Sequence, residues 1–335
     1  MTKSLNQAVS MKQILDLVRD DLNRVEQAIG LETIGSVAAI NTISHHMQAA
    51  GGKRLRPILL LLSSRLVSSR TETTEDAIQL AAVVELIHTS TLVHDDVIDE
   101  AKMRRGRPSA NALWGNQMSV LAGDWLYMQA FQIAMRQRNF TILDILIGLT
   151  QMMVEGELLQ LDRLGRIDIS EADYMELVDR KTASLFNACC RLGAMAGSAD
   201  DAMSARLGEF AWNLGMAFQL IDDVLDFTSK ENILGKPVGN DLAEGKVTLP
   251  LLYALGETTR EETRLIEIIL KDRSYERVPF STVLEIIEKY RGVERSLERA
   301  NQFTARAKEI IDAFPDSPYQ KAVLTIAALI TERDR

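Results

Sequence analysis

The chain of 335 residues contains only two cysteines and has 5% aromatic residues. Two cysteines cannot supply the disulfide framework on which small secreted folds depend. Cys189 and Cys190 are neighbours inside an apolar stretch, where a disulfide would be strained and a metal ion would lack further ligands. The N-terminal residues show neither the apolar block of a signal peptide nor an Arg-rich transit pattern. We therefore expect two buried, reduced thiols in a cytoplasmic protein.

The sequence also lacks a long basic run and an unbroken hydrophobic run. Its 38 Lys and Arg against 47 Asp and Glu give a net charge of -9, so nucleic acid is not an expected partner. The most apolar stretch, residues 77–93, contains Gln79, Glu85 and His88, which makes a membrane-spanning segment too costly. With 46% hydrophobic residues, the composition is that of an ordinary globular protein.

Proline is scarce, with seven in the chain and none between Pro108 and Pro237. Long helices can run through that stretch uninterrupted, and apolar residues recur at three- and four-residue intervals almost throughout. The pattern predicts an all-α fold, and the lack of a composition shift predicts a single domain over residues 1–335. The expected helices cover residues 8–28, 33–49, 55–69, 75–99, 117–137, 141–163, 170–197, 201–228, 246–256, 260–271, 279–291, 293–313 and 316–332.

Two of these helices, 75–99 and 201–228, are apolar nearly all round, which is typical of helices in the centre of a bundle. Both end in the same acidic pattern, Asp-Asp-Val-Ile-Asp at 95–99 and Asp-Asp-Val-Leu-Asp at 222–226. If consecutive long helices run up and down, the two acidic ends lie on the same side of the bundle.

Residues four apart on a helix share a face, so each motif pairs its first and last carboxylates. A helix C-terminus already carries partial negative charge, and a divalent cation such as Mg²⁺ would offset the added aspartates. One such motif alone is more simply a solvated acidic helix end, but two copies on apolar helices favour a metal site. The candidate ligands are Asp95, Asp96, Asp99, Asp222, Asp223 and Asp226.

Basic residues stand at two nearby positions of the chain. The stretch Gly-Gly-Lys-Arg-Leu-Arg-Pro at 51–57 precedes a helix, and Arg104 and Arg105 follow the first acidic motif. Guanidinium and ammonium groups beside a turn suit phosphate oxygens. Together with the acidic motifs they predict a site for two diphosphates, one bound through metal ions and the other directly by Lys and Arg.

These motifs resemble those of the trans-isoprenyl diphosphate synthases, also called polyprenyl synthetases, and above all their long-chain members. The resemblance covers most of the chain and rests on GGKRLRP (51–57), HDDVIDEAKMRRG (94–106), VEGELLQL (154–161), KTASLF (181–186), GMAFQLIDDVLDF (215–227) and GKPVGNDLAEGKVTLPLL (235–252). It implies one large helical bundle around a central deep cavity. It also implies a prenyltransferase that joins isopentenyl diphosphate head to tail onto an allylic prenyl diphosphate.

The resemblance also assigns roles to individual residues. The six aspartates would hold Mg²⁺, three ions with substrate bound and with Mn²⁺ as a substitute, and Arg104 would contact the allylic diphosphate. The isopentenyl diphosphate site would comprise Lys53, Arg56, His88 and Arg105. Residues around the allylic diphosphate and the reacting carbons would be Lys181, Thr182, Gln219, Asp222, Lys236 and Lys246.

Product length in this family depends on residues that precede the first acidic motif. An aromatic side chain four or five positions before the first aspartate gives short products, and here those positions hold Thr91 and Ser90. Small residues there imply a long product of the octaprenyl or solanesyl type, unless Ile87 closes the tunnel earlier. Family members are homodimers, which residues 117–137 could form across a two-fold axis, with at most transient membrane contact.

Four other functions compete with this interpretation. A short-chain synthase making farnesyl or geranylgeranyl diphosphate would share every catalytic residue and differ only in tunnel depth. A class I terpene cyclase needs no second diphosphate site, and a helical metal-dependent phosphohydrolase needs more histidines than the four present. A non-catalytic regulatory subunit is the remaining alternative, but such relatives lose an aspartate motif, whereas both motifs are intact here.

Overall fold

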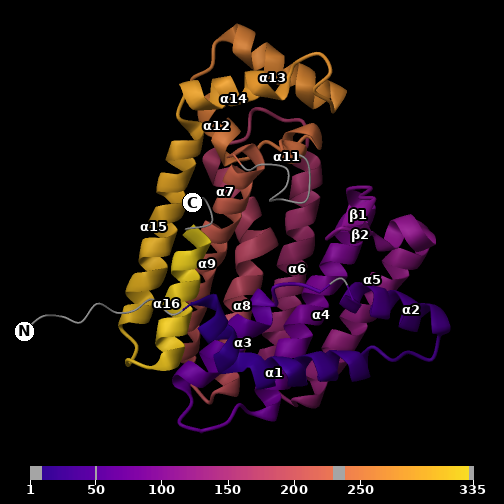
Figure 1. The fold of residues 1–335 in the computed structure, drawn as a ribbon, viewed down its shortest axis with the longest axis vertical. Helices are drawn as coiled ribbons and strands as arrows, with labels where there is room; N and C mark the ends of the chain where they lie inside the picture. Colours follow the sequence, from indigo (N-terminus) through magenta and orange to yellow (C-terminus); the bar gives the residue numbers. More distant parts are fainter. Residues whose placement is uncertain (1–9, 50, 229–237, 332–335) are drawn as a thin grey trace, which may run out of the picture. The chain divides into compact units, whose positions relative to one another are not determined.

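A computed structural model describes residues 10–49, 51–228 and 238–331 (Figure 1). Helices dominate it, which confirms the all-α prediction. The elements up to residue 136 are α1 (Met11–Glu32), α2 (Ala38–Ala49), α3 (Leu55–Val67), α4 (Glu75–Ile98), β1 (Met103–Arg104), β2 (Arg107–Pro108) and α5 (Ala110–Arg136). They are followed by α6 (Phe140–Arg163), α7 (Glu171–Val178), the π-helix η1 (Asp179–Ala183), α8 (Ser184–Ala196), α9 (Asp201–Thr228), α11 (Asn240–Ala243), α12 (Leu249–Leu255), α13 (Arg260–Asp272), α14 (Phe280–Lys289), α15 (Gly292–Asp312) and α16 (Pro318–Thr331).

The described residues group into two compact units, each assembled from separate stretches of the chain. Unit 1 comprises Met1–Thr150, Phe186–Glu209 and Ile310–Ile326. Unit 2 comprises Gln151–Leu185, Phe210–Glu309 and Ala327–Arg335. Because the stretches interleave, neither unit corresponds to one contiguous domain of the sequence.

In unit 1, α4 forms the core and packs against α1, α3 and α5. Thr74 caps its N-terminus by accepting the N–H of Ala77, and the acidic first turn complements the helix dipole. Among the described helices only α4 is long and apolar enough by composition to cross a membrane, yet 67% of its most apolar stretch is buried inside the protein. A core helix meets the same criterion, and burial on all sides explains the apolar sequence of α4.

Helices α3 and α8 approach each other closely in unit 1 because small residues line their contact. A Cβ atom added at Gly193 would lie 2.3 Å from the backbone oxygen of Leu60, and one at Gly197 would lie 2.5 Å from that of Ser64. Gly193→Ala should therefore push the helices apart and destabilise the protein by about 1–3 kcal/mol. Urea unfolding followed by tryptophan fluorescence measures the change.

Gly148→Ala is the matched control for this variant. Gly148 also lies in a helix of unit 1, but no atom would come within 4 Å of an added Cβ. Alanine should be neutral or stabilising there, because it favours helix. Equal losses at the two positions would contradict the close-contact explanation.

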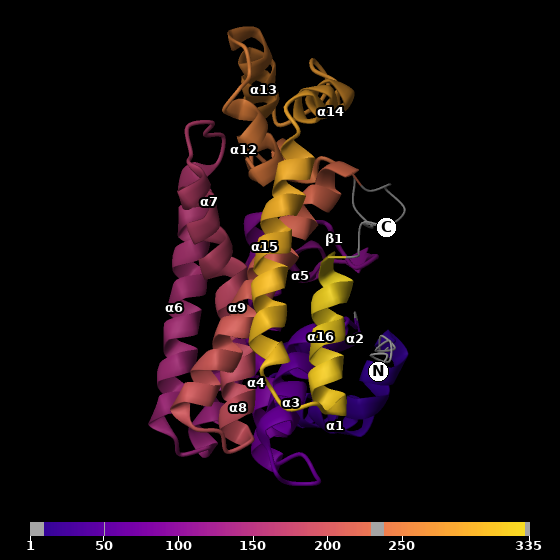
Figure 2. The ribbon, with the colours of Figure 1, turned by 90° about the vertical axis from the view of Figure 1, so that its left-hand side faces the viewer.

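Two clusters of buried hydrophobic residues lie in the described part of unit 2. One gathers α11, α12, α13 and α14 around residues such as Leu251, Ile266 and Ile287, and Figure 2 shows α12, α13 and α14 close together at one end of this unit. The other joins α7 to α9 and α15 through Tyr174, Leu220 and Ala300. The second core therefore fixes α7 against the helix that carries the second acidic motif.

The structure departs from the predicted elements in several places, and α11 (Asn240–Ala243) lies in a stretch where no helix was expected. A short β-hairpin pairs Met103 with Pro108 and Arg104 with Arg107, where only a loop was expected. Helix α5 begins at Ala110 rather than at 117, but Gly115 interrupts it with a φ of 81°, so the continuous helix starts near the predicted residue. The expected helix 170–197 contains the π-helical turn η1, which carries Lys181 and Thr182.

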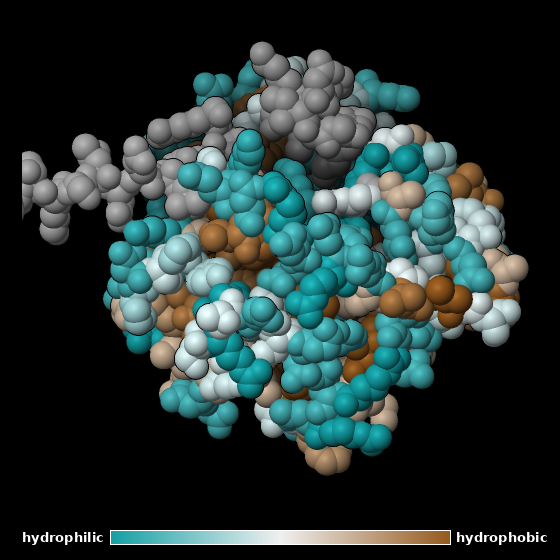
Figure 3. Space-filling model, turned by 60° about the horizontal axis from the view of Figure 1, so that its bottom comes forward, coloured by the Kyte–Doolittle hydropathy of each residue, from teal (hydrophilic) through white to brown (hydrophobic). Residues whose placement is uncertain are grey.

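Helix α5 presents a line of exposed hydrophobic side chains. Leu121, Met128 and Met135 are 64%, 60% and 59% exposed, and their spacing of seven residues places them on one face. Phe140 and Ile147 continue the exposed apolar residues on α6. On the face in Figure 3, polar side chains predominate and hydrophobic ones form separate patches. The line on α5 is therefore a candidate contact surface.

Candidate active site

The first acidic motif forms the C-terminal turn of α4 in unit 1. The backbone N–H of Asp99 donates to the backbone oxygen of Asp95 at 2.8 Å, so the helical geometry that pairs these carboxylates is present. The side chains of Asp95 and Asp99 are half-buried. Asp96, between them, is only 1% exposed, so its environment differs from that of the two flanking aspartates.

Asp96 on α4 forms hydrogen bonds that hold the β-hairpin against this helix. Its Oδ1 accepts hydrogen bonds from Arg104 Nε at 2.8 Å and Arg104 Nη2 at 2.5 Å. Its backbone oxygen accepts the N–H of Ala101 and the side-chain amide of Asn111, each at 2.9 Å. Its Oδ2 is buried and has no hydrogen-bond partner among the described residues. Arg104, assigned by resemblance to a diphosphate, is thus held by a carboxylate of the acidic motif.

The oxygen atoms of the first acidic motif fit a hard divalent cation whose coordination shell is completed by other ligands. In the described part of the chain, no three His, Cys, Asp or Glu side chains converge closely enough to hold a metal ion alone. Mg²⁺ is usually bound by one or two carboxylates, with water and substrate phosphate supplying the remaining oxygens. Asp95, Asp99 and the unpartnered oxygen of Asp96 meet that requirement. Since the second motif belongs to unit 2, a shared site of all six aspartates stays a prediction.

Arg56 and His88 lie side by side in unit 1. Arg56 Nη1 is 3.0 Å from His88 Nε2, and the guanidinium lies 5.4 Å from the centre of the Phe186 ring. Burial, and then the charge of Arg56, lower the pKa of His88 well below its usual range. The imidazole is therefore neutral, and because an arginine can only donate, Nε2 accepts this hydrogen bond.

The remaining basic candidates of unit 1 surround the same loop. Lys53 is exposed, and the Arg105 guanidinium donates to the backbone oxygen of Gly51. An added Cβ at Gly52 would lie 2.7 Å from Arg105 Nη1, so the glycine allows this approach. Burial is the largest influence on Arg105 and lowers its pKa. The structure thus places Arg105 against the loop that carries Lys53 and leads into Arg56.

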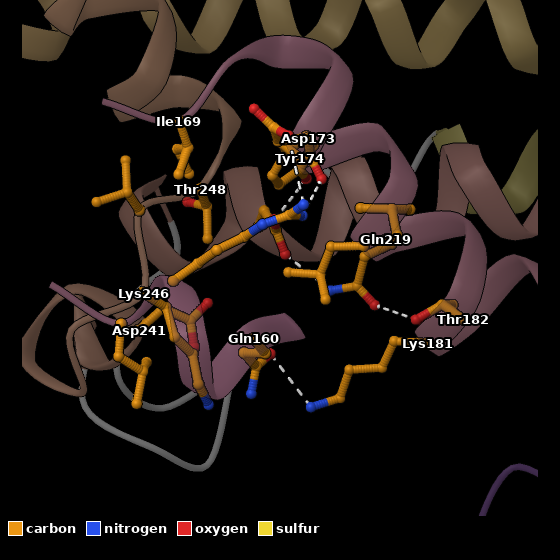
Figure 4. A pocket seen from close by; sticks show the side chains of 16 residues that line it. Gln160, Ile169, Asp173, Tyr174, Lys181, Thr182, Gln219, Asp241, Lys246 and Thr248 are labelled. Carbon is orange, nitrogen blue, oxygen red and sulfur yellow. Dashed lines mark hydrogen bonds and ion pairs between the residues drawn. The ribbon is translucent and has the colours of Figure 1, made fainter. Parts of the chain in front are cut away.

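Unit 2 contains a pocket of about 170 Å³. Figure 4 shows side chains from α6, η1, α9 and the segment after α11 around it. Its polar lining residues are Gln160, Arg163, Asp173, Tyr174, Lys181, Thr182, Gln219, Asp223, Asp241, Lys246 and Thr248. Five candidates therefore converge here, namely Lys181, Thr182, Gln219, Asp223 and Lys246.

A chain of hydrogen bonds orients the amide of Gln219. Gln219 Nε2 donates to Asp223 Oδ1 at 2.7 Å, and its Oε1 accepts the Thr182 hydroxyl at 2.9 Å. Tyr174 donates to Asp223 Oδ2 at 2.6 Å. Because the Thr182 hydroxyl donates to Oε1 while Nε2 donates to Asp223, the carbonyl of Gln219 faces Thr182.

The three aspartates of the second motif also differ from one another. Asp222 is exposed, whereas Asp223 and Asp226 are 4% and 1% exposed. Burial, and then the charge of Asp241, raise the pKa of Asp223 to about 8. Asp226 Oδ2 accepts the backbone N–H of Asp241 at 3.2 Å. Asp241 is therefore linked to the second acidic motif. In the sequence, the only sign of this role is that Asp241 lies within the family-like stretch 235–252.

The candidate lysines of unit 2 make ion pairs. Lys181 Nζ lies 2.5 Å from Glu157 and donates to Gln160 at 3.2 Å, and Lys246 lies 2.7 Å from Glu244. Lys181 sits in the π-helical turn η1, a local geometry that is frequent at functional sites. Lys236 lies outside the described residues.

Tyr174 was not predicted, because no pattern in its helix distinguishes it from a core residue. Tyr174→Phe should destabilise the protein by about 1–3 kcal/mol, since the buried Asp223 Oδ2 would lose its hydrogen-bond donor. Urea unfolding tests this. Tyr290→Phe is the control, because Glu262 would keep its bonds to Thr259 and Lys289 and should show a clearly smaller loss. Equal losses would contradict the assignment.

The chain-length candidates lie along α4. Ile87 and Ser90 are completely buried, and Thr91 is half-buried. Ser90 donates to the backbone oxygen of Gly123 on α5 at 2.7 Å, and an added Cβ at Gly123 would lie 2.3 Å from His94 Nε2. Ser90 therefore lies in a tight helix contact, and Thr91 is the more accessible of the two small residues.

Comparison with known proteins finds relatives that match nearly the whole chain. Residues 37–287 match the family model described as polyprenyl synthetase. An octaprenyl diphosphate synthase from Haemophilus influenzae is 36% identical over 97% of this chain and 98% of its own length. A short chain isoprenyl diphosphate synthase from Methanothermobacter thermautotrophicus is 35% identical over 97% of this chain and 100% of its own length.

A similar structure is also known. The crystal structure of a polyprenyl synthase from Caulobacter crescentus, complexed with calcium and isoprenyl diphosphate, has a TM-score of 0.91 and 35% sequence identity. The match covers 99% of this chain and 100% of that one.

Proposed function

This chain belongs to the polyprenyl synthetase family and is a prenyltransferase, and we propose that it is a Mg²⁺-dependent long-chain trans-polyprenyl diphosphate synthase. The observation that carries this proposal is the arrangement in unit 1. Asp95 and Asp99 end the same helix on which His88 contacts Arg56, while Arg105 is bonded to the loop that carries Lys53. Acidic and basic groups so combined suit two diphosphates, as a synthase requires.

The proposed reaction needs no nucleophile from the protein. The allylic C–O bond breaks with both electrons staying on the diphosphate oxygen, and the double bond of isopentenyl diphosphate forms the new C–C bond at that carbon. A proton then leaves the adduct for the released diphosphate. Mg²⁺ held by the six aspartates would neutralise the departing diphosphate.

The chain's own residues bind and orient the substrates. Lys53, Arg56 and Arg105 would bind the isopentenyl diphosphate, with the neutral His88 fixing the guanidinium of Arg56. Thr182 and the oriented carbonyl of Gln219 would face the reacting carbons from the pocket of unit 2. Asp222, Lys181, Lys236 and Lys246 would bind the allylic side. Holding both substrates in register supplies a large part of the rate enhancement.

Sequence identity does not separate the two product classes, because a long-chain and a short-chain relative are almost equally identical to this chain. We therefore base the proposed product length on the small residues Ser90 and Thr91. The first experiment incubates the protein with labelled isopentenyl diphosphate, farnesyl diphosphate and Mg²⁺, with EDTA as a control. Dephosphorylated products are then resolved by length. A long, metal-dependent polyprenol is expected, whereas a geranylgeranyl product would support a short-chain synthase. No incorporation with any allylic primer would favour the regulatory subunit.

We also propose a homodimer that forms through the exposed line on α5. Leu121→Glu with Met128→Glu should convert the dimer to a monomer, because charge would replace apolar contact. Light scattering after size exclusion measures the mass. Met11→Glu, at an exposed position of α1, is the control and should leave the mass unchanged. A monomeric wild type would contradict the proposal.

We propose a cytoplasmic location because of the state of the two cysteines. Cys189 and Cys190 are both free and buried, and burial raises the pKa of Cys190 to about 12. Thiols kept protonated in this way are inert core residues. They support a location in the reducing cytoplasm, with transient membrane contact for a lipid product.

A further inference from the structure

Arg54 has an unusual backbone conformation beside the basic cluster. It is the residue before α3, with φ 48° and ψ 33°, a left-handed conformation that is uncommon for residues with a side chain. The α3 helix begins from it, since the N–H of Ile58 donates to the Arg54 backbone oxygen at 3.0 Å. Surrounding contacts must therefore hold Arg54 in place.

Two carboxylates hold the Arg54 guanidinium. Nη1 donates to Glu85 on α4 at 2.7 Å, and Nε donates to Glu26 on α1 at 2.5 Å. The Glu85 side chain is 6% exposed, whereas that of Glu26 is 42% exposed. The pair with Glu85 is thus a buried ion pair, in which the loss of one partner leaves an uncompensated charge.

This ion pair lies between the residues that carry the basic cluster. Lys53 directly precedes Arg54, and Arg56 follows it by two residues on α3. Glu85 is one helical turn before His88, which contacts Arg56. At the other end of the loop, the Arg105 guanidinium donates a hydrogen bond to the backbone oxygen of Gly51. The loop is therefore fixed at both ends, and Glu85 links it to the helix of the first acidic motif.

We propose that Glu85 and Arg54 are positioning residues that hold the loop 51–54 and the first turn of α3, so that Lys53 and Arg56 meet the diphosphate of isopentenyl diphosphate. The inference rests on the proposed function. Neither residue needs to touch the substrate. Arg54 differs from its basic neighbours because its guanidinium is already engaged by two carboxylates.

Charge alone predicts the opposite effect of removing Glu85. A carboxylate beside Arg56 and Arg105 weakens the attraction of the site for a diphosphate, so Glu85→Gln would tighten binding if only charge mattered. If Glu85 positions the loop, Glu85→Gln weakens binding instead. The direction of the change therefore separates the two roles.

The kinetic test measures KM for isopentenyl diphosphate, KM for the allylic substrate and kcat. Glu85→Gln should raise the first KM about 10- to 100-fold, as expected for misplaced binding groups, and leave the other two nearly unchanged. Glu26→Gln removes the more exposed partner and should give a smaller rise without loss of folding. Glu75→Gln is the control, because Glu75 also joins α4 to α1, through Arg24 at 2.8 Å, but is 64% exposed.

Hydrogen exchange of the protein without substrate tests the positioning directly. In Glu85→Gln the amide of Ile58 should exchange at least about tenfold faster, and in Glu75→Gln it should not change. Unchanged exchange, or a lower KM, would overturn the inference. A wild type that does not incorporate isopentenyl diphosphate would overturn the proposed function, and exchange at Ile58 would still decide whether Glu85 holds the loop.

Discussion

Replacing both Asp95 and Asp99 with asparagine is expected to lower the rate of chain elongation by about a thousandfold or more. Asparagine keeps the size of the side chain but removes the negative charge that a divalent cation requires. The two carboxylates lie on the last turn of α4, where the helix dipole already disfavours negative charge. The variant should therefore fold as well as the wild type. Incorporation of labelled isopentenyl diphosphate and thermal unfolding measure the two effects.

Two further substitutions show whether this loss is specific. Glu100→Gln removes a charge from an exposed residue next to the motif and should leave elongation nearly unchanged. Asp96→Asn breaks the buried pair with Arg104 and should lower the melting temperature as well as activity. If Glu100→Gln reduced elongation as much as the double variant, the loss would reflect overall charge rather than metal binding.

The sequence predicted the helices well, because their signals are local. Apolar residues at three- and four-residue intervals indicate helices, and the apolar composition of α4 and α9 indicates helices buried on all sides. The hairpin escaped prediction because its turn places Arg105 and Gly106 at φ values of 51° and 75°, and arginine is not typical of that conformation. The π-helical turn leaves no trace in the hydrophobic pattern, since it shifts the helix by a single residue.

The sequence proposes the site residues by type, but it does not give the environment of each one. The two acidic motifs have the same sequence pattern, yet Asp96 is bonded to Arg104 whereas Asp223 is bonded to Tyr174 and Gln219. Those partners come from elsewhere in the chain, so spacing alone could not separate the buried aspartates from their neighbours. The same holds for Arg54, because the carboxylates that distinguish it from Lys53 and Arg56 lie on α1 and α4.

Thr91→Phe is expected to change the product from a long polyprenyl chain to a short one. The two small residues before the first acidic motif differ in burial. Ser90 is completely buried and bonded to Gly123, so a phenylalanine there would collide with α5, whereas Thr91 is half-buried. An aromatic ring at Thr91 should block the growing tail after few additions. Chromatography of the dephosphorylated products measures the shift.

Ser90→Ala is the matched control, because it removes the hydroxyl without adding volume. It should keep the long product and lose only the stability of one hydrogen bond, about 1 kcal/mol. If Thr91→Phe left the product length unchanged, the tail would pass elsewhere, and Ile87 would be the next candidate on the same helix. Ile87→Ala would then be expected to lengthen the product. Since Ile87 is fully buried, that variant also loses about 2–5 kcal/mol of stability, which Thr91→Phe need not do.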